Sequence, residues 1–293
     1  MIHVGPAGWS YADWEGRVTP RRKPRGFHGL AHLARYLGFV EVNSSFYALP
    51  SARNAERWAG LVADHPTFRF GVKLYQGFTH AADLSGDERV RAREQFLRGV
   101  EPLAVAGRLW SVLAQFPVSF RPGRASWRRL ERIAEEFGVH PLVLEVRHRS
   151  WFTPEHLRRI EGLGYSLATI DLPAAPDHPP TDVPSIGPLG YHRLHGRNAG
   201  AWFDREAGRD QRYDYLYGAD EVAELVQVTR RIASGSDETA VITNNHFSGK
   251  AVANALEILA ALDGAPPLAP AELVEAFPHL RDVVRVDGQA TLF

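Results

Sequence analysis

Residues 141–171 read PLVLEVRHRSWFTPEHLRRIEGLGYSLATID, and this stretch holds one complete strand–helix–strand unit. The apolar run Leu142–Arg147 predicts one buried strand, and Tyr165–Asp171 predicts a second. Between them, Thr153-Pro154-Glu155 is typical of a helix N-cap and first turn, and Gly162 ends the helix. Two strands that are joined through a helix favour a parallel pairing.

The same unit recurs along the whole chain. The predicted strands are Ile2–Gly5, Phe39–Asn43, Phe68–Lys73, Leu109–Gln115, Leu142–Arg147, Tyr165–Asp171, Tyr191–His195 and Ala240–Asn245. Further helical patterns occupy Phe27–Leu37, Ser51–Asp64, Asp87–Ala106, Trp127–Phe137, Asp220–Ile232 and Gly249–Leu262. Eight such units favour a closed barrel, so we predict an α/β fold with a single irregular (β/α)8 TIM barrel over residues 1–264. Residues 265–293 are predicted to form a C-terminal extension with an apolar tail.

Two connections break the regular alternation of strands and helices. Leu172–Pro188 contains six prolines where the sixth helix should lie, which predicts an extended loop. Gly196–Gly218 is also long and mixes arginines with tryptophan and tyrosines. That mixture suits stacking and contact with anions. The alternative is that its tyrosines pack on the rim of the barrel.

Composition excludes several classes of function. The 34 basic and 34 acidic residues of this 293-residue chain cancel, so any anion site must be local. The absence of cysteine excludes disulfides, thiolate metal sites and cysteine nucleophiles. A first strand at Ile2 and the lack of any apolar run of about 18 residues favour a cytoplasmic protein without a signal peptide.

Several motifs together resemble those of one family. They are Gly8-Trp9-Ser10-Tyr11, Val40-Glu41-Val42-Asn43-Ser44-Ser45-Phe46-Tyr47, Gln115-Phe116-Pro117, Glu145-Val146-Arg147-His148-Arg149-Ser150-Trp151-Phe152, Arg193-Leu194-His195-Gly196-Arg197 and Asn244-Asn245. With these motifs the chain resembles the YecE-like family, a domain of unknown function that is described as a TIM barrel. That family is similar in architecture to sugar isomerases and to abasic-site endonucleases. The resemblance therefore implies the barrel but assigns no reaction.

The predicted strands end in polar residues, and in this fold the active site lies where strands end. Glu145 is our candidate general acid or base, with its pKa set by Lys73 and Arg147. Asp171 can act as a second carboxylate, and His195 can carry a proton. The alternative is a structural ion-pair network that holds the top of the barrel. Residues predicted to contact substrate are Trp9, Glu41, Asn43, Tyr47, His80, Gln115, Arg147, Trp151, Arg193, Arg197, Asn244 and Asn245.

Lys73 has a second interpretation. Only Lys23, Lys73 and Lys250 are lysine among the 34 basic residues, so lysine at the end of an apolar strand can have a chemical reason. A desolvated lysine is nucleophilic, and a Schiff base at Lys73 is an alternative to acid–base chemistry.

No cofactor is identified from the sequence. A divalent metal is an alternative, because separate strands can supply oxygen and nitrogen ligands without a local motif. The candidate ligands are Glu41, His80, Glu145, Asp171, His195 and His246.

The turn into the last helix predicts a phosphate site. Ser248, Gly249 and Lys250 would present backbone amides and one charge at a helix N-terminus. The alternative is a tight turn that is capped by Ser248.

The chain ends Gln289-Ala290-Thr291-Leu292-Phe293. This resembles the peptide by which bacterial repair proteins dock on the sliding clamp, with Gln289, Leu292 and Phe293 as the docking residues. The alternative is that the two apolar residues pack on the barrel.

Together these observations favour an enzyme that performs acid–base or hydrolytic chemistry on a sugar- or phosphate-bearing substrate. DNA with an abasic site is one concrete candidate. One alternative is a small-sugar isomerase or a glycoside hydrolase-like enzyme. Another is a non-catalytic module that binds nucleic acid or the clamp.

Overall fold

The computed structural model describes residues 1–80, 84–204 and 206–288. Its centre is a sheet of eight parallel strands in the order β1-β8-β7-β6-β5-β4-β3-β2. The strands are β1 (Ile2–Pro6), β2 (Phe39–Val42), β3 (Arg69–Lys73), β4 (Leu109–Gln115), β5 (Leu142–Glu145), β6 (Tyr165–Asp171), β7 (Leu189–Leu194) and β8 (Glu238–Thr243). Each predicted strand is present, with its bounds shifted by at most two residues.

The sheet comes close to closure between β1 and β2. Ala7 and Glu41 form an isolated parallel bridge, and the amide of Gly8 donates to the carbonyl of Glu41 at 2.9 Å. Gly5 lets the two strands approach, because a Cβ at this position would lie 1.8 Å from the carbonyl oxygen of Phe39. The predicted α/β fold, a single (β/α)8 barrel, is confirmed.

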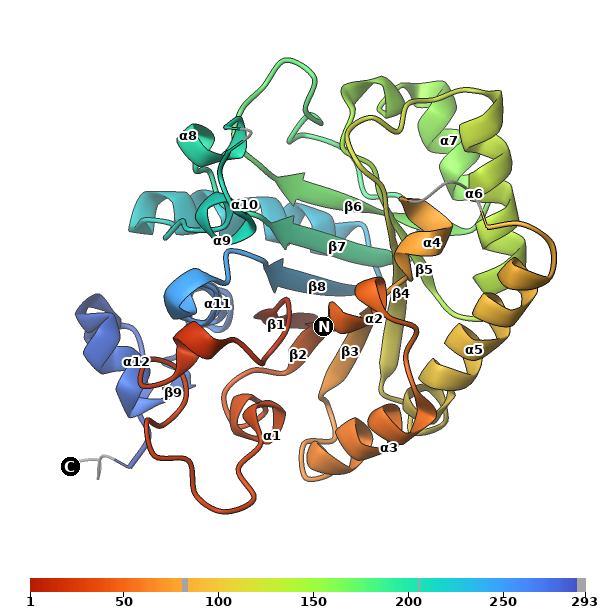
Figure 1. Cartoon of the computed structure of the whole chain (residues 1–293). Helices are drawn as coiled ribbons and strands as arrows, with labels where there is room; N and C mark the ends of the chain where they lie inside the picture. Colours follow the sequence, from red (N-terminus) through yellow and green to blue (C-terminus); the bar gives the residue numbers. More distant parts are fainter. Residues whose placement is uncertain (81–83, 205, 289–293) are drawn as a thin grey trace.

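Helices surround the strands in an outer layer (Figure 1). They are α1 (Gly29–Leu33), α3 (Ala52–Leu61), α5 (Gly86–Val105), α6 (Arg124–Phe137), α7 (Pro154–Gly162), α10 (Ala219–Ser234) and α11 (Lys250–Asp263). In α6 the buried residues Trp127, Leu130, Ile133 and Phe137 are three or four positions apart, so they form one apolar face toward the strands.

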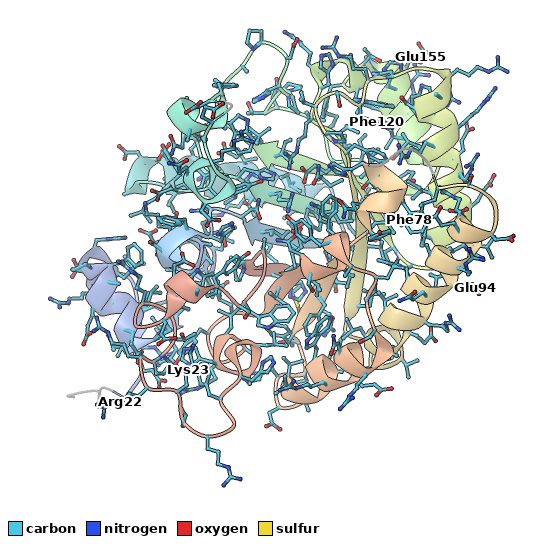
Figure 2. All side chains as sticks on the ribbon, in the orientation of Figure 1. Arg22, Lys23, Phe78, Glu94, Phe120 and Glu155 are labelled. Atoms are coloured by element: carbon cyan, nitrogen blue, oxygen red, sulfur yellow. The ribbon has the colours of Figure 1, made fainter. Side chains whose placement is uncertain are left out.

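The apolar core has two parts. Strand residues such as Phe39, Leu113, Tyr191 and Ile242 fill the interior of the barrel. A second and larger cluster lies between the strands and the helix layer. Figure 2 shows the outer side of this layer, where the charged side chains of Glu94 and Glu155 point away from the barrel.

The proline-rich segment 172–188 contains no helix, as predicted. The second long connection, Gly196–Gly218, contains short helices that were not predicted. It contains two one-turn helices, α8 (Ala199–Trp202) and α9 (Arg209–Arg212), beside the ends of β7 and β8 (Figure 1). Asn198 holds them together, because its side chain caps Ala201 at 3.3 Å and donates to the carbonyl of Gln211 at 3.0 Å.

Residues 265–288 pack on the barrel. They form β9 (Leu268–Ala269), α12 (Ala271–Ala276), the 3-10 turn η4 (Pro278–Asp282) and β10 (Arg285–Val286). Ala269, Leu273 and Leu280 are fully buried in the outer apolar cluster, and Asp287 accepts a hydrogen bond from Tyr36 at 2.8 Å. The predicted clamp-docking residues Gln289, Leu292 and Phe293 lie outside the described residues. Within the described ranges, no helix is both long and apolar enough to cross a bilayer.

Candidate active site

A pocket of about 500 Å³ opens where the strands end. Each of the eight strands contributes to the pocket wall, either through its last residues or through the segment that follows it. The lining residues are Tyr11, Asn43, Phe46, Tyr47, Lys73, His80, Gln115, Pro117, Val118, Arg147, Leu172, His178, Arg193, Trp202, Arg212, Tyr213, Asn244 and His246. No aspartate or glutamate among the described residues lines this pocket, whereas one lysine and three arginines do. The pocket therefore favours an anionic ligand.

A fully buried ion network forms the floor beneath this pocket. Arg193 on β7 donates to Glu41 on β2 through Nη2 at 2.6 Å and through Nε at 3.1 Å. Its Nη1 donates to Glu145 on β5 at 2.9 Å. Tyr191 lies two residues earlier on the same face of β7 and donates its hydroxyl to Glu41 at 2.6 Å. One arginine thus joins two carboxylates across the inside of the barrel.

Arg147 completes the network from the side of the pocket. Its Nε donates to the second oxygen of Glu145 at 2.7 Å. Burial alone would raise the pKa of Glu145, but Arg193 and Arg147 hold that pKa well below its usual range. Glu145 is therefore a permanent carboxylate near neutral pH. Glu145 is fully buried, accepts a hydrogen bond on each oxygen and does not border the pocket. Its role is therefore to balance the charge of the two arginines.

Lys73 has no carboxylate partner within the described residues. Its ammonium lies over the ring of Phe46, 3.9 Å from the ring centre. The oxygens of Glu41 and Glu145 are taken by Arg193, Arg147 and Tyr191. Burial, with Arg193 nearby, lowers the pKa of Lys73 to about 7. Lys73 is thus a cation at the pocket wall that can lose its proton near neutral pH.

His195, which was predicted to carry a proton, and His80, which was predicted to contact substrate, occupy different positions. Burial and Arg147 lower the pKa of His195 to about 3, and His195 is fully buried, with Nε2 3.6 Å from Glu145 and Nδ1 3.0 Å from Asn244. His80 lines the pocket, and loss of hydration with Lys73 nearby lowers its pKa to about 4. Both imidazoles are neutral at pH 7, so His195 lacks the charge change near neutral pH on which its predicted role depends.

Asp171 belongs to a separate network beside the pocket. Arg197 donates to it through Nη2 at 2.7 Å and through Nε at 3.0 Å, and Tyr217 donates its hydroxyl at 2.6 Å. Asp171 is buried and does not line the pocket. The Tyr217 hydroxyl also accepts the amide hydrogen of Gly196 at 2.8 Å, so this network fixes the loop after β7.

Five predicted contact residues do not line the pocket. Two of them, Glu41 and Arg197, belong to the networks described above, and the other three are Trp151, Trp9 and Asn245. Trp151 is fully buried, is stacked on Phe120 at 5.2 Å and donates to that residue's carbonyl at 2.7 Å. Trp151 belongs to the core, contrary to the prediction that it would contact substrate. Trp9 packs against Trp58 at 5.3 Å, and Asn245 donates to the carbonyl of Tyr215 at 2.9 Å.

The turn that was predicted to bind phosphate already holds carboxylates of this chain. The amide of Ser248 donates to Asp13, and Lys250 is paired with Asp214. Gly249 has a φ of +84°, and a Cβ there would lie 2.8 Å from Val18. These contacts explain the turn as part of the fold, and none of its three residues lines the pocket.

The structure also places residues in the pocket wall that the sequence prediction did not choose. Arg212 and Tyr213 come from the long loop after β7, and His178 comes from the proline-rich segment. The arginine and aromatic content of Gly196–Gly218 indicated that this loop could bind a ligand. Composition alone does not predict which of its residues point into the pocket. Among the described residues, no three His, Asp or Glu side chains are grouped so that they can hold a metal ion.

A family model for "Protein of unknown function DUF72" matches residues 3–274. The chain belongs to this family. YunF of Bacillus subtilis strain 168 is 28% identical over 280 residues, which cover 90% of this chain and 95% of YunF. YecE of Escherichia coli K12 is 33% identical over 156 residues, which cover 52% of this chain and 50% of YecE.

Solved structures of other members have the same fold. A DUF72 protein of Enterococcus faecalis V583 superposes with a TM-score of 0.79 at 27% identity, over 90% of this chain and 96% of its own. A DUF72 protein of Thermotoga maritima MSB8 has a TM-score of 0.76 at 32% identity, over 90% of this chain and 99% of its own. The family resemblance that the motifs predicted is confirmed, and so is the barrel.

Proposed function

We propose that this protein is an enzyme that performs acid–base or hydrolytic chemistry on a small anionic substrate, such as a sugar phosphate or sugar acid, with Lys73 as the proton-transfer group. One observation carries the proposal. Lys73 borders a pocket whose other charged lining residues are all arginines, yet it has no carboxylate partner among the described residues. A cation that only stabilised the fold would be paired, as Arg193 is.

The pocket offers separate groups for the parts of such a substrate. Arg147 and Arg212 can take a phosphate or carboxylate, because guanidinium groups bind these anions. Other lining residues carry side-chain amides or aromatic rings that suit hydroxyl groups and sugar faces, namely Asn43, Gln115, Asn244, Phe46, Tyr47, Trp202 and Tyr213.

Lys73 suits proton transfer better than the carboxylates do. A general base works best when its pKa lies near the working pH, and the pKa of Lys73 is about 7. Glu145 is fully buried and paired, and Asp171 is held by Arg197 and Tyr217. The two carboxylates that the sequence offered as acid and base therefore position cations in this proposal.

The test is deuterium exchange at the carbon next to a carbonyl group. The protein is incubated in D₂O with ribose 5-phosphate, fructose 6-phosphate and their unphosphorylated sugars, and ¹H NMR follows the loss of that proton and any product. We expect exchange or conversion of a phosphorylated sugar that increases as the pH rises through about 7, where Lys73 becomes a free amine.

Lys73→Arg keeps the charge but cannot act as a base, so it should retain sugar phosphate binding and lose the reaction. Lys23→Arg is the matched control, because Lys23 lies on an exposed outer loop (Figure 2). Full activity of Lys73→Arg would contradict the proposal.

A second candidate substrate is DNA with an abasic site, which presents a sugar and phosphates together. The observation that favours it is aromatic surface at the pocket and beside it. The side chain of Tyr47 is 59% exposed and that of Phe203 is 53% exposed, which suits stacking on an unpaired base. Fluorescence anisotropy over a salt series, with an undamaged duplex as control, tests this. Equal binding to both duplexes would exclude this candidate.

A further inference from the structure

The surroundings of Lys73 are those of an amine nucleophile as well as those of a base. Its side chain is half-buried and borders the pocket, so the nitrogen is accessible from one side and desolvated from the other. The ammonium of Lys73 contacts the aromatic face of Phe46 and not a carboxylate of the described residues.

The neighbouring carboxylates leave the nitrogen free. Glu41 accepts from Arg193 and Tyr191, and Glu145 accepts from Arg193 and Arg147. Both carboxylates therefore have hydrogen-bond partners other than Lys73 on each oxygen. Arginine could not replace lysine in this role, because a guanidinium group stays protonated and cannot attack a carbonyl carbon. The chain uses lysine at only three positions among 34 basic residues, and Lys73 is the only one of the three that lines the pocket.

We propose that Lys73 forms a covalent imine with an aldehyde or ketone group of an anionic sugar-type substrate. This inference rests on the proposed function and names its substrate class as a carbonyl compound. The ammonium of Lys73 first releases one proton to solvent. The free amine then forms a bond between nitrogen and the carbonyl carbon, and the nitrogen transfers a proton to oxygen to give a carbinolamine.

The carbinolamine next loses its oxygen as water together with the second nitrogen-bound hydrogen, which leaves the C=N bond. Amine and carbonyl thus give imine and one water, with no oxidant or reductant. Protonation of the imine makes the adjacent carbon acidic, so it can lose the proton whose exchange the proposed function predicts. An anionic group at Arg147 and Arg212 would fix the carbonyl end toward Lys73.

The experiment is reductive trapping. The unmodified protein is incubated at pH 7 with dihydroxyacetone phosphate, ribose 5-phosphate or pyridoxal 5′-phosphate, and borohydride reduces any imine to a stable secondary amine. Peptide mass spectrometry then quantifies the adduct at each of the three lysines. The exposed Lys23, and Lys250 paired with Asp214, are internal controls in the same molecule.

We expect at least a tenfold excess of adduct at Lys73 over either control at pH 7. A pKa of about 7 leaves roughly half of its amine free, whereas an ordinary exposed lysine is almost wholly protonated. The excess should decrease at pH 5, where Lys73 is protonated. Excess inorganic phosphate should reduce labelling of Lys73 by competing for the arginines, and should leave Lys23 unchanged.

Equal adduct at the three lysines, or none at Lys73 with any of the three probes, would overturn the inference. Because the measurement uses the unmodified chain, it does not depend on whether a variant folds. If deuterium exchange occurs without trapping, Lys73 acts as a base only, and the proposed function stands while the imine does not. If neither occurs with any sugar phosphate, both fail.

Discussion

Replacement of Arg193 with methionine tests whether the floor of the pocket is the ion network described above. Arg193 is 2% exposed and makes three hydrogen bonds to two carboxylates that are themselves fully buried. The substitution keeps much of the volume but leaves Glu41 and Glu145 with one positive partner, Arg147, between them. Removal of one partner from a buried ion pair costs about 3–5 kcal/mol, because the remaining charge is uncompensated.

Each charge-assisted hydrogen bond is worth about 1.5–3 kcal/mol, so three of them would suggest a larger loss. The variant, however, no longer buries a guanidinium group, so it avoids the desolvation cost of that charge, and this offsets part of the loss. We therefore expect the free energy of unfolding at pH 7 to decrease by about 3–5 kcal/mol, measured by urea denaturation and tryptophan fluorescence. Lys23→Met removes an exposed ion pair with Glu15 and should leave the free energy of unfolding unchanged.

The loss should also depend on pH. In the wild type the pKa of Glu145 is depressed, so its contribution to stability is present above the unfolded-state value of 4.5 and is lost only as the pH falls through the folded-state pKa. Without Arg193 that pKa rises, and Glu145 takes up a proton at a higher pH than in the wild type. The difference between the two proteins should therefore be smaller at pH 4 than at pH 7. A loss below about 1 kcal/mol, or one that is equal at both pH values, would refute the argument.

Three further substitutions test other parts of the structure. Tyr217→Phe removes the hydroxyl that donates to Asp171, and the free energy of unfolding, measured by thermal or urea denaturation, should decrease by about 1–3 kcal/mol. An unchanged free energy of unfolding would show that this network does not stabilise the fold. Trp151→Ala should cost about 3–5 kcal/mol in urea denaturation because the side chain is fully buried, whereas a rim residue would change ligand binding alone. Gly5→Ala should abolish soluble, cooperatively folding protein, as judged by size-exclusion chromatography and circular dichroism, because a Cβ would lie 1.8 Å from the carbonyl of Phe39; a folded variant would show that β1 and β2 can separate.

The sequence predicted the fold well because the fold depends on local patterns that repeat. Apolar strands followed by amphipathic helices identify each unit, and eight units imply closure. The helix-free segment 172–188 was predictable for the same local reason, since proline removes backbone donors. The one-turn helices α8 and α9 were not, because they depend on tertiary contacts such as the bond from Asn198 to Gln211.

The candidate site was predicted only in part. Glu145 and Arg193, which were both predicted as site residues, meet inside the barrel, since both lie on inward-facing positions of alternate strands. Sequence could not say which cation would satisfy which carboxylate, because that choice depends on side-chain reach across the barrel. Trp151 was misplaced for a related reason, since the segment after β5 turns its indole under Phe120 and away from the rim.

The pairing within the floor decides the chemistry that the pocket can perform. A structural interpretation of the charged strand ends holds for Glu41, Glu145 and Arg193, which are all buried and bonded to one another. That interpretation fails for Lys73, which lies at the pocket wall and has no carboxylate partner among residues 1–80, 84–204 and 206–288. Burial, followed by the nearby charge of Arg193, lowers the pKa of Lys73, and Glu41 and Glu145 oppose this shift only in part. The buried network thus both holds the barrel together and prepares one lysine to react.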